Sequence, residues 1–278
     1  MPTVHINGFD MHYHAIGQGL PLVFVHGLLS SIDMADALGE TPAYLSDRFR
    51  LIRYDARGHG RSGYTTNPSD YTWDALADDL LGLFRHLGIE RASLWGSSVG
   101  GGTALVFTLR HPEMVERLIL RPPPPLGQQA SAFSAQLFGG LSLLIDGLGL
   151  EKAADIALAL RPWAGLKEAS PELFNWIRNF LLSQNAEGIV PAIRGIVLGP
   201  ELAQEPFEEV KAPTLIVAHP DDPIHPLASA EALHKRMQGS KLVVAPSIIH
   251  YQLHPEELAA VIEGFLRDSS APPVPTRP

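Results

Sequence analysis

The chain has 278 residues, of which 45% are hydrophobic and 18% charged, so it holds enough apolar material for a sizeable core. Its formal net charge of -9 argues against nucleic-acid binding, and the absence of cysteine excludes disulfides, thiolate metal sites and a cysteine nucleophile. The N-terminus lacks a basic start followed by an apolar core, and the apolar runs are too short to span a bilayer. We therefore expect a cytoplasmic protein without a membrane span.

Turn and strand signals open the chain and then alternate with helical ones. The first residues alternate around Asn7-Gly8, which predicts a hairpin turn. Short runs rich in Val, Leu and Ile then recur, as is typical of strands buried on both faces, at 20–27, 49–55, 92–97, 117–121, 213–218 and 241–246. Helical patterns lie between most of them, for example at 73–88 and 254–268. This order predicts an α/β fold with a mostly parallel central sheet and helices on both faces.

One long segment interrupts the alternation. Residues 126–206 show helical periods and no convincing strand, so we interpret them as a helical cap inserted after the sixth strand. The core domain would then comprise 1–125 and 207–268. The tail 269–278, rich in proline and serine, is expected to be flexible.

A glycine-flanked serine marks the candidate chemistry. Residues 96–100 fit G-x-S-x-G with Ser98 at the centre, between a predicted strand and a predicted helix. Such a turn pushes the serine above the sheet, beside the unpaired N–H groups of the helix N-terminus. A serine hydroxyl still needs a base, and the base needs a carboxylate to orient it.

Those partners are expected after the late strands. Asp221 and Asp222 follow the strand at 213–218, and one of the pair is expected to be a simple turn residue. His250 follows the last strand, and its place in a loop favours it as the base. His254 precedes Pro255 and two glutamates, so it reads as the start of the final helix.

Four motifs make the chain resemble the α/β-hydrolase fold family over residues 5–268: "VHGLLSS" (25–31), "YDARGHGRS" (54–62), "GSSVGG" (96–101) and "HPDDPIHP…IIH" (219–250). The resemblance implies Ser98 as nucleophile, Asp222, four before Pro226, as acid and His250 as base. It also implies an oxyanion hole from the amides of Leu28 and Val99. The second motif reads as structural. The spacing from His250 to Pro255 is shorter than the family's, which keeps His254 as a second candidate.

These assignments predict a serine hydrolase that cleaves a small-molecule ester or lactone of a small to medium apolar acyl group, with no metal or organic cofactor. Apolar side chains expected to bind the substrate are Leu29, Phe138, Trp163 and Trp176. The only cations that we would watch as anchors for an anionic substrate are Arg121 and Arg161. Two alternatives stay open: a carbon–carbon bond hydrolase on the same triad, which Tyr251 after the histidine disfavours, and a slow-turnover ligand sensor.

Overall fold

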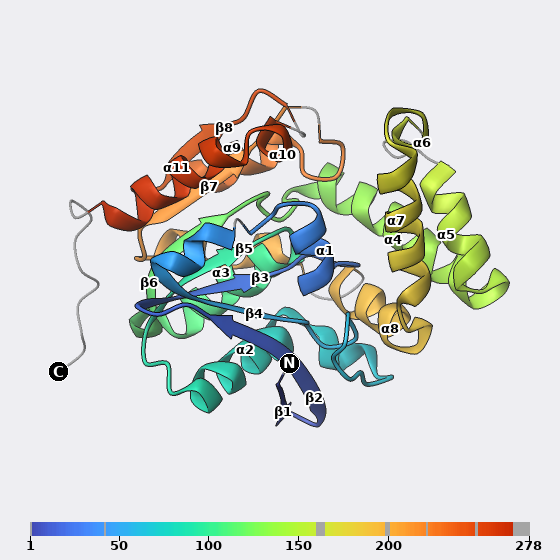
Figure 1. Ribbon diagram of the computed structural model, residues 1–278, viewed down its shortest axis with the longest axis horizontal. Helices are drawn as coiled ribbons and strands as arrows, with labels where there is room; N and C mark the ends of the chain where they lie inside the picture. Colours follow the sequence, from blue (N-terminus) through green and yellow to red (C-terminus); the bar gives the residue numbers. More distant parts are fainter. Residues whose placement is uncertain are drawn as a thin grey trace.

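The computed structural model of the chain describes residues 2–41, 43–159, 165–197, 201–220, 222–247 and 250–268. Within them, eight strands form one sheet in the order β1-β2-β4-β3-β5-β6-β7-β8 (Figure 1). Strand β2 runs antiparallel to its neighbours β1 and β4, and every other pair is parallel, which confirms the predicted mostly parallel sheet. The strands are β1 (Thr3–Ile6), β2 (Phe9–Ile16), β3 (Leu20–Val25), β4 (Phe49–Tyr54), β5 (Ala92–Gly96), β6 (Val115–Leu120), β7 (Thr214–Ala218) and β8 (Lys241–Val244).

The first two strands form the hairpin that the sequence predicts. Asn7 and Gly8 both have positive φ, 46° and 85°, as a two-residue turn between twisted strands requires. Strand β2 of the hairpin pairs with β4, and β1 lies at the edge of the sheet.

The sheet is buried on both faces, which is why its strands read as continuous apolar runs. On β3, Val23 and Val25 join the core that includes side chains of α2, α3 and α9, whereas Leu22 and Phe24 join the core that includes those of α1 and α11. The helices that cover the two faces are α1 (Ile32–Ala37), α2 (Trp73–Leu87), α3 (Val99–Arg110), α9 (Leu227–Arg236) and α11 (Pro255–Arg267). A short helix, α10 (His250–Leu253), precedes α11. Short 3-10 turns are η1 (Ala43–Asp47), η2 (Pro68–Tyr71), η3 (Pro112–Met114), η4 (Leu202–Gln204) and η5 (Phe207–Glu209).

Among the described residues, five α-helices intervene between β6 and β7, and Figure 1 shows them gathered together beyond the sheet, on the right of the view. They are α4 (Gln128–Leu148), α5 (Leu150–Ala159), α6 (Leu166–Ala169), α7 (Pro171–Ser183) and α8 (Ala186–Val197). By length and composition alone, Ala130–Leu148 within α4 could cross a bilayer, but helices of soluble proteins share that composition, and here α4 packs against α5 and α8.

Glycines let the turn after β5 fit against the end of β3. A Cβ on Gly100 would lie 1.9 Å from the carbonyl oxygen of Val25 and 2.6 Å from that of His26. A Cβ on Gly96 would lie 2.4 Å from the carbonyl oxygen of Gly100. Backbone therefore packs on backbone at this point, and no side chain fits between.

Replacing Gly100 by Ala tests this packing. The added methyl meets main-chain atoms that cannot rotate away, so we expect Gly100→Ala to lower the free energy of unfolding by about 2–3 kcal/mol. Gly264→Ala is the matched control, because Gly264 also lies in a helix but a Cβ there meets nothing within 4 Å. The control should gain up to about 1 kcal/mol. Urea denaturation of both variants measures the difference, and equal effects would contradict the packing argument.

Candidate active site

Ser98 sits at the strained corner between β5 and α3. Its φ of 54° and ψ of −113° are rare for a residue with a side chain, and strain of this kind gathers at functional sites. The Ser98 amide donates a hydrogen bond of 2.8 Å to the carbonyl of Pro122, which ties the corner to the segment that follows β6. Ser97 beside it is buried, with 5% of its surface exposed. The strained position thus falls on Ser98, in the register that the motif predicts.

Asp222 organises the turn after β7 through its own side chain. Its Oδ1 accepts hydrogen bonds from the backbone N–H groups of Ile224, at 2.8 Å, and His225, at 3.0 Å. Short polar side chains commonly fold the following residues back in this way. The turn places the His225 ring directly over the Asp222 carboxylate. Asp221, the rival acid, lies outside the described residues.

His225 bridges Asp222 and Ser98. Its Nδ1 lies 2.7 Å from Asp222 Oδ2, and its Nε2 lies 2.7 Å from Ser98 Oγ. A carboxylate can only accept, so Nδ1 carries the proton, and in a neutral ring Nε2 is free to accept from the serine hydroxyl. The three side chains have the hydroxyl–imidazole–carboxylate arrangement that activation of a serine requires.

The sequence analysis did not name His225, and it expected His250 in this place. In the structure, His250 begins α10, and its Nε2 lies 2.8 Å from Glu257 Oε2 rather than beside Ser98 or Asp222. His254 is the N-cap residue of α11, at the helix start where the sequence places it. The sequence favours His250 because it follows the last strand, whereas the structure places His225 beside Ser98 and Asp222. A histidine three residues beyond the acid reaches the same point through a tight turn.

The charge on Asp222 is stabilised despite burial. Burial alone raises the pKa of this carboxyl, but the hydrogen bonds and positive charge of His225, together with the Ile224 amide, outweigh it and lower the pKa to about 2. Because the folded pKa lies below the ordinary value of 3.8, the ionised carboxylate stabilises the fold above that pH. That contribution is lost as the pH falls through 2. His219 lies close to the same carboxylate, with Nε2 3.7 Å from Oδ2.

Two backbone amides beside Ser98 are available to a ligand. The N–H groups of Leu28 and Val99, the predicted oxyanion donors, make no hydrogen bond to the described residues. A Cβ on Gly27 would lie 3.4 Å from Ser98 Cβ, so the loop that carries Leu28 runs directly against the serine. Val99 opens α3, where the helix dipole adds partial positive charge.

A buried histidine fixes the loop that carries Leu28. The Ala56 amide donates to His26 Nε2 at 2.9 Å, so the proton of a neutral His26 ring is on Nδ1, which donates to the Gly27 carbonyl at 2.8 Å. Burial keeps the pKa of His26 below its usual value, although the Asp55 charge and the bond to Gly27 oppose this. The ring therefore stays neutral, and its hydrogen bonds connect the loop at Gly27 to the loop at Ala56.

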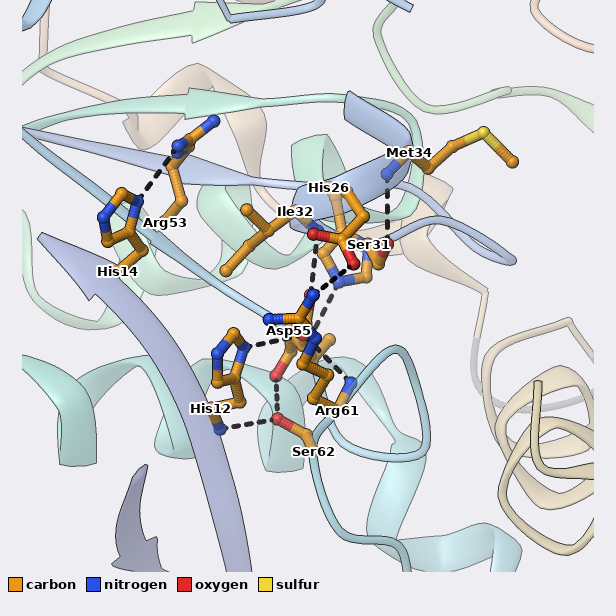
Figure 2. Close-up of polar contacts among 12 residues, drawn as sticks. His12, His14, His26, Ser31, Ile32, Met34, Arg53, Asp55, Arg61 and Ser62 are labelled. Atoms are coloured by element: carbon orange, nitrogen blue, oxygen red, sulfur yellow. Dashed lines mark hydrogen bonds and ion pairs between the residues drawn. The ribbon is translucent and has the colours of Figure 1, made fainter. Parts of the chain in front are cut away.

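The Asp55 carboxylate also stabilises this region, through the hydrogen bonds shown in Figure 2. Its Oδ2 accepts from His12 Nδ1 at 2.9 Å and from the Arg61 amide at 3.0 Å, and its Oδ1 accepts from the Ile32 amide at 2.8 Å. The carboxylate is 2% exposed, so it serves these donors rather than a ligand. The contacts agree with the structural interpretation of this motif.

Two further residues of the "YDARGHGRS" motif are also held inside the protein. Arg57 forms a buried ion pair with Asp79, at 2.7 Å between Nη2 and Oδ1, and also donates to the carbonyl of Asn7 in the hairpin. His59 Nδ1 donates to the Arg57 carbonyl at 2.9 Å, and burial lowers the pKa of His59 to about 4.

The predicted substrate-binding residues separate into two groups. Leu29 and Phe138 are half-buried, and both pack against the same apolar cluster as Leu28 does. Trp176 belongs to another cluster around Met34 and stacks on Phe180, with ring centroids 5.7 Å apart. Trp163 lies outside the described residues. The structure thus places two of the four against the cluster that Leu28 joins.

A buried cation near the site has its own counter-charge. Burial lowers the pKa of Arg121, while the Glu40 carboxylate and Tyr251 oppose this. The guanidinium also lies 5.5 Å from the centre of the Tyr251 ring. Burial raises the pKa of Glu40, while Arg121 and His225 oppose this, so Glu40 is coupled to both. Arg161, the other cation considered, lies outside the described residues.

Comparison with known families decides the broad class. The family model described as the alpha/beta hydrolase fold matches residues 21–255 of the chain. The chain belongs to the α/β hydrolase family.

Curated members of this α/β hydrolase family resemble the chain over most of its length. AB hydrolase superfamily protein YisY of Bacillus subtilis is 32% identical over 238 residues, which cover 82% of this chain and 84% of the relative. The 3-oxoadipate enol-lactonase 2 of Acinetobacter baylyi is 26% identical, with coverage of 95% and 96%. A putative carbamate hydrolase, RutD of a Caulobacter species, is 28% identical, with coverage of 82% and 84%.

Solved structures agree with this assignment. The enol-lactonase from Burkholderia xenovorans LB400 superposes with a TM-score of 0.82 at 26% identity, over 96% of this chain and all of that one. A thermophilic esterase from Thermogutta terrifontis gives a TM-score of 0.74 at 27% identity, with coverage of 95% and 96%. The chain is therefore similar to hydrolases in both sequence and fold.

The Asp55 anchor generates a stability prediction. Asp55→Asn exchanges one carboxylate oxygen for an N–H₂ group that faces a donor, so we expect a loss of about 2–3 kcal/mol in unfolding free energy. Asp33→Asn is the control, because Asp33 is half exposed and pairs with Arg61 at the surface. It should change stability by less than about 0.5 kcal/mol. Thermal unfolding measured by circular dichroism compares the two, and equal losses would contradict the anchoring role.

Proposed function

We propose that the protein is a serine hydrolase that cleaves a carboxylic ester or lactone through an acyl-enzyme on Ser98. The observation that carries the proposal is the relay from Ser98 Oγ to His225 and on to Asp222, with both contacts at 2.7 Å. The strained backbone of Ser98 and the two amides beside it support the same chemistry. The lactonase and esterase relatives make an ester-type bond the natural target.

In the proposed reaction, His225 Nε2 takes the hydroxyl proton as Ser98 Oγ attacks the substrate carbonyl carbon. The amides of Leu28 and Val99 donate to the oxygen that becomes negative, and Asp222 stabilises the imidazolium. His225 then gives the proton to the leaving alkoxide. A water molecule, deprotonated by His225, hydrolyses the acyl-enzyme and restores Ser98.

The base is the point on which the structure and the family pattern disagree. We assign it to His225, because that ring already contacts both partners. His250, which the family pattern favours, has Glu257 as its partner instead. Both histidines can be removed separately, so the assignment is open to a direct test.

We further propose that residues 126–206 form a cap over a core of 1–125 and 207–268, and that the cap gives the site an apolar roof. Phe138 and Leu141 of α4 cluster with Leu28 and Leu29 of the loop beside Ser98. The positive charge of Arg121 interacts electrostatically with Glu40, which weakens its attraction for a substrate carboxylate. An uncharged, largely apolar acyl group fits this environment best.

Variants of the two histidines test the relay. His225→Ala should lower kcat for a p-nitrophenyl ester by about 1,000-fold or more, since the nucleophile loses its activation. His250→Ala, the matched control, should keep kcat within about threefold, because the His250 imidazole contacts Glu257 rather than the residues of the proposed relay. Circular dichroism verifies that both variants fold. Loss of activity in His250→Ala but not in His225→Ala would move the base to His250.

A fluorophosphonate probe supplies the companion measurement on the same protein. The probe should attach once, to Ser98, and Ser98→Ala should abolish labelling, whereas Ser97→Ala should retain it. Labelling of Ser97 in the wild type would contradict the proposed nucleophile.

The apolar roof predicts a chain-length preference. Across p-nitrophenyl esters, kcat/KM should rise from acetate by up to about fourfold per methylene, because each buried CH₂ contributes about 0.8 kcal/mol, and should fall once the pocket is full. Hemisuccinate should react more slowly than the neutral ester of equal length. A flat series, or a preference for the anionic ester, would contradict the roof. Turnover of a vinylogous diketone in place of every ester and lactone would instead support carbon–carbon bond hydrolysis.

A further inference from the structure

Two histidines and two glutamates gather where α10 meets α11. His250 and His254 are four residues apart on one helical turn, which the hydrogen bond from the His254 amide to the His250 carbonyl closes at 2.9 Å. Their ring centroids are 4.9 Å apart, so the two imidazoles share one face. None of these four residues belongs to the proposed relay of Ser98, His225 and Asp222.

The glutamates bring carboxylates to the same face. Glu257 spans both histidines, with Oε2 2.8 Å from His250 Nε2 and Oε1 4.0 Å from His254 Nδ1. Glu256 Oε1 lies 3.7 Å from His254 Nδ1. One ligand atom each from His254, Glu256 and Glu257 can be chosen so that all lie within 4.8 Å of one another.

These separations are close to those that a tetrahedral ion imposes. With metal–nitrogen and metal–oxygen bonds of about 2.0–2.1 Å, two ligands of a tetrahedral Zn²⁺ lie about 3.3 Å apart. The observed contacts, from 2.8 to 4.0 Å, lie on both sides of that value. Small rotations of exposed side chains suffice to close the set around an ion.

We propose that His254, Glu256 and Glu257, with the His250 ring next to that of His254, form a surface site for a divalent transition-metal ion of the Zn²⁺ class. Mixed imidazole and carboxylate ligands favour Zn²⁺, Ni²⁺ or Cu²⁺, whereas Mg²⁺ and Ca²⁺ prefer oxygen alone. A histidine pair four apart on a helical turn is a recurring way to present two nitrogens to zinc. The ion would also neutralise two adjacent carboxylates, and water would complete its coordination.

The position of the site defines its role. Side-chain exposures of 48% for His254 and 54% for Glu257 leave the ligands accessible from solvent. The ion would clamp α10 to the first turn of α11, and α11 packs on the core through Leu258 and Ile262. Its expected effect is stabilisation of this end of the chain, independent of catalysis.

Calorimetric titration of the full, tag-free chain with ZnCl₂ tests the proposal. We expect one ion per chain, with the affinity falling at least tenfold in both His254→Ala and Glu257→Gln. His5→Ala is the matched control: His5 Nδ1 contacts Asp10 at 2.8 Å on the surface, but the described residues provide no third ligand there. The control should bind as the wild type does.

A second readout separates loss of the site from loss of the fold. Zinc should raise the Tm of the wild type and of His5→Ala, but not that of His254→Ala or Glu257→Gln, and all four should share one circular dichroism spectrum. Should either variant fail to fold, Glu256→Gln takes its place and should weaken binding at least threefold. Absence of binding at millimolar zinc, or binding that these variants leave unchanged, would overturn the proposal.

Discussion

The approach of α3 to the end of β3 is the constraint on which the rest of the candidate site depends. Gly100 lets the first turn of α3 rest against the carbonyls of Val25 and His26, so the Ser98 corner and the loop at Gly27 meet at backbone distance. Ser98 has a positive φ at this corner, and the amides of Leu28 and Val99 form no hydrogen bond with the described residues. His26 and Asp55 then hold the second loop in place, with buried polar groups fully engaged in that task.

Buried charged side chains around the site are stabilised by hydrogen bonds and ion pairs with nearby residues. Asp222 stays ionised because three hydrogen bonds from Ile224 and His225, together with the electrostatic effect of His225, outweigh its desolvation. Arg57 and Asp79 form a buried ion pair, and Glu40 and Arg121 influence each other electrostatically. Apolar side chains of α4, in the proposed cap, and of the loop at Leu28 pack against one hydrophobic cluster.

The sequence predicted those features that short segments determine by themselves. The strands, the turn at Asn7-Gly8 and the register of Ser98 follow from local periodicity and from glycine spacing, and the structure has them within a few residues. The position of the imidazole could not be read in this way, because the decisive signal was a three-residue offset between Asp222 and His225 inside one loop. The different environments of Phe138 and Trp176 depend on how α4 and α7 pack, which helical periodicity alone does not specify.

The turn that joins Asp222 to His225 has a mechanical consequence. Their contact is fixed by hydrogen bonds within four consecutive residues, whereas the contact to Ser98 joins segments 127 residues apart. Carboxylate and imidazole therefore move as one rigid unit, and a single separation, from that unit to the hydroxyl, governs whether the relay is connected. In the proposed relay, slight loosening between the ends of β5 and β7 would separate Ser98 from His225 while the Asp222–His225 contact persists.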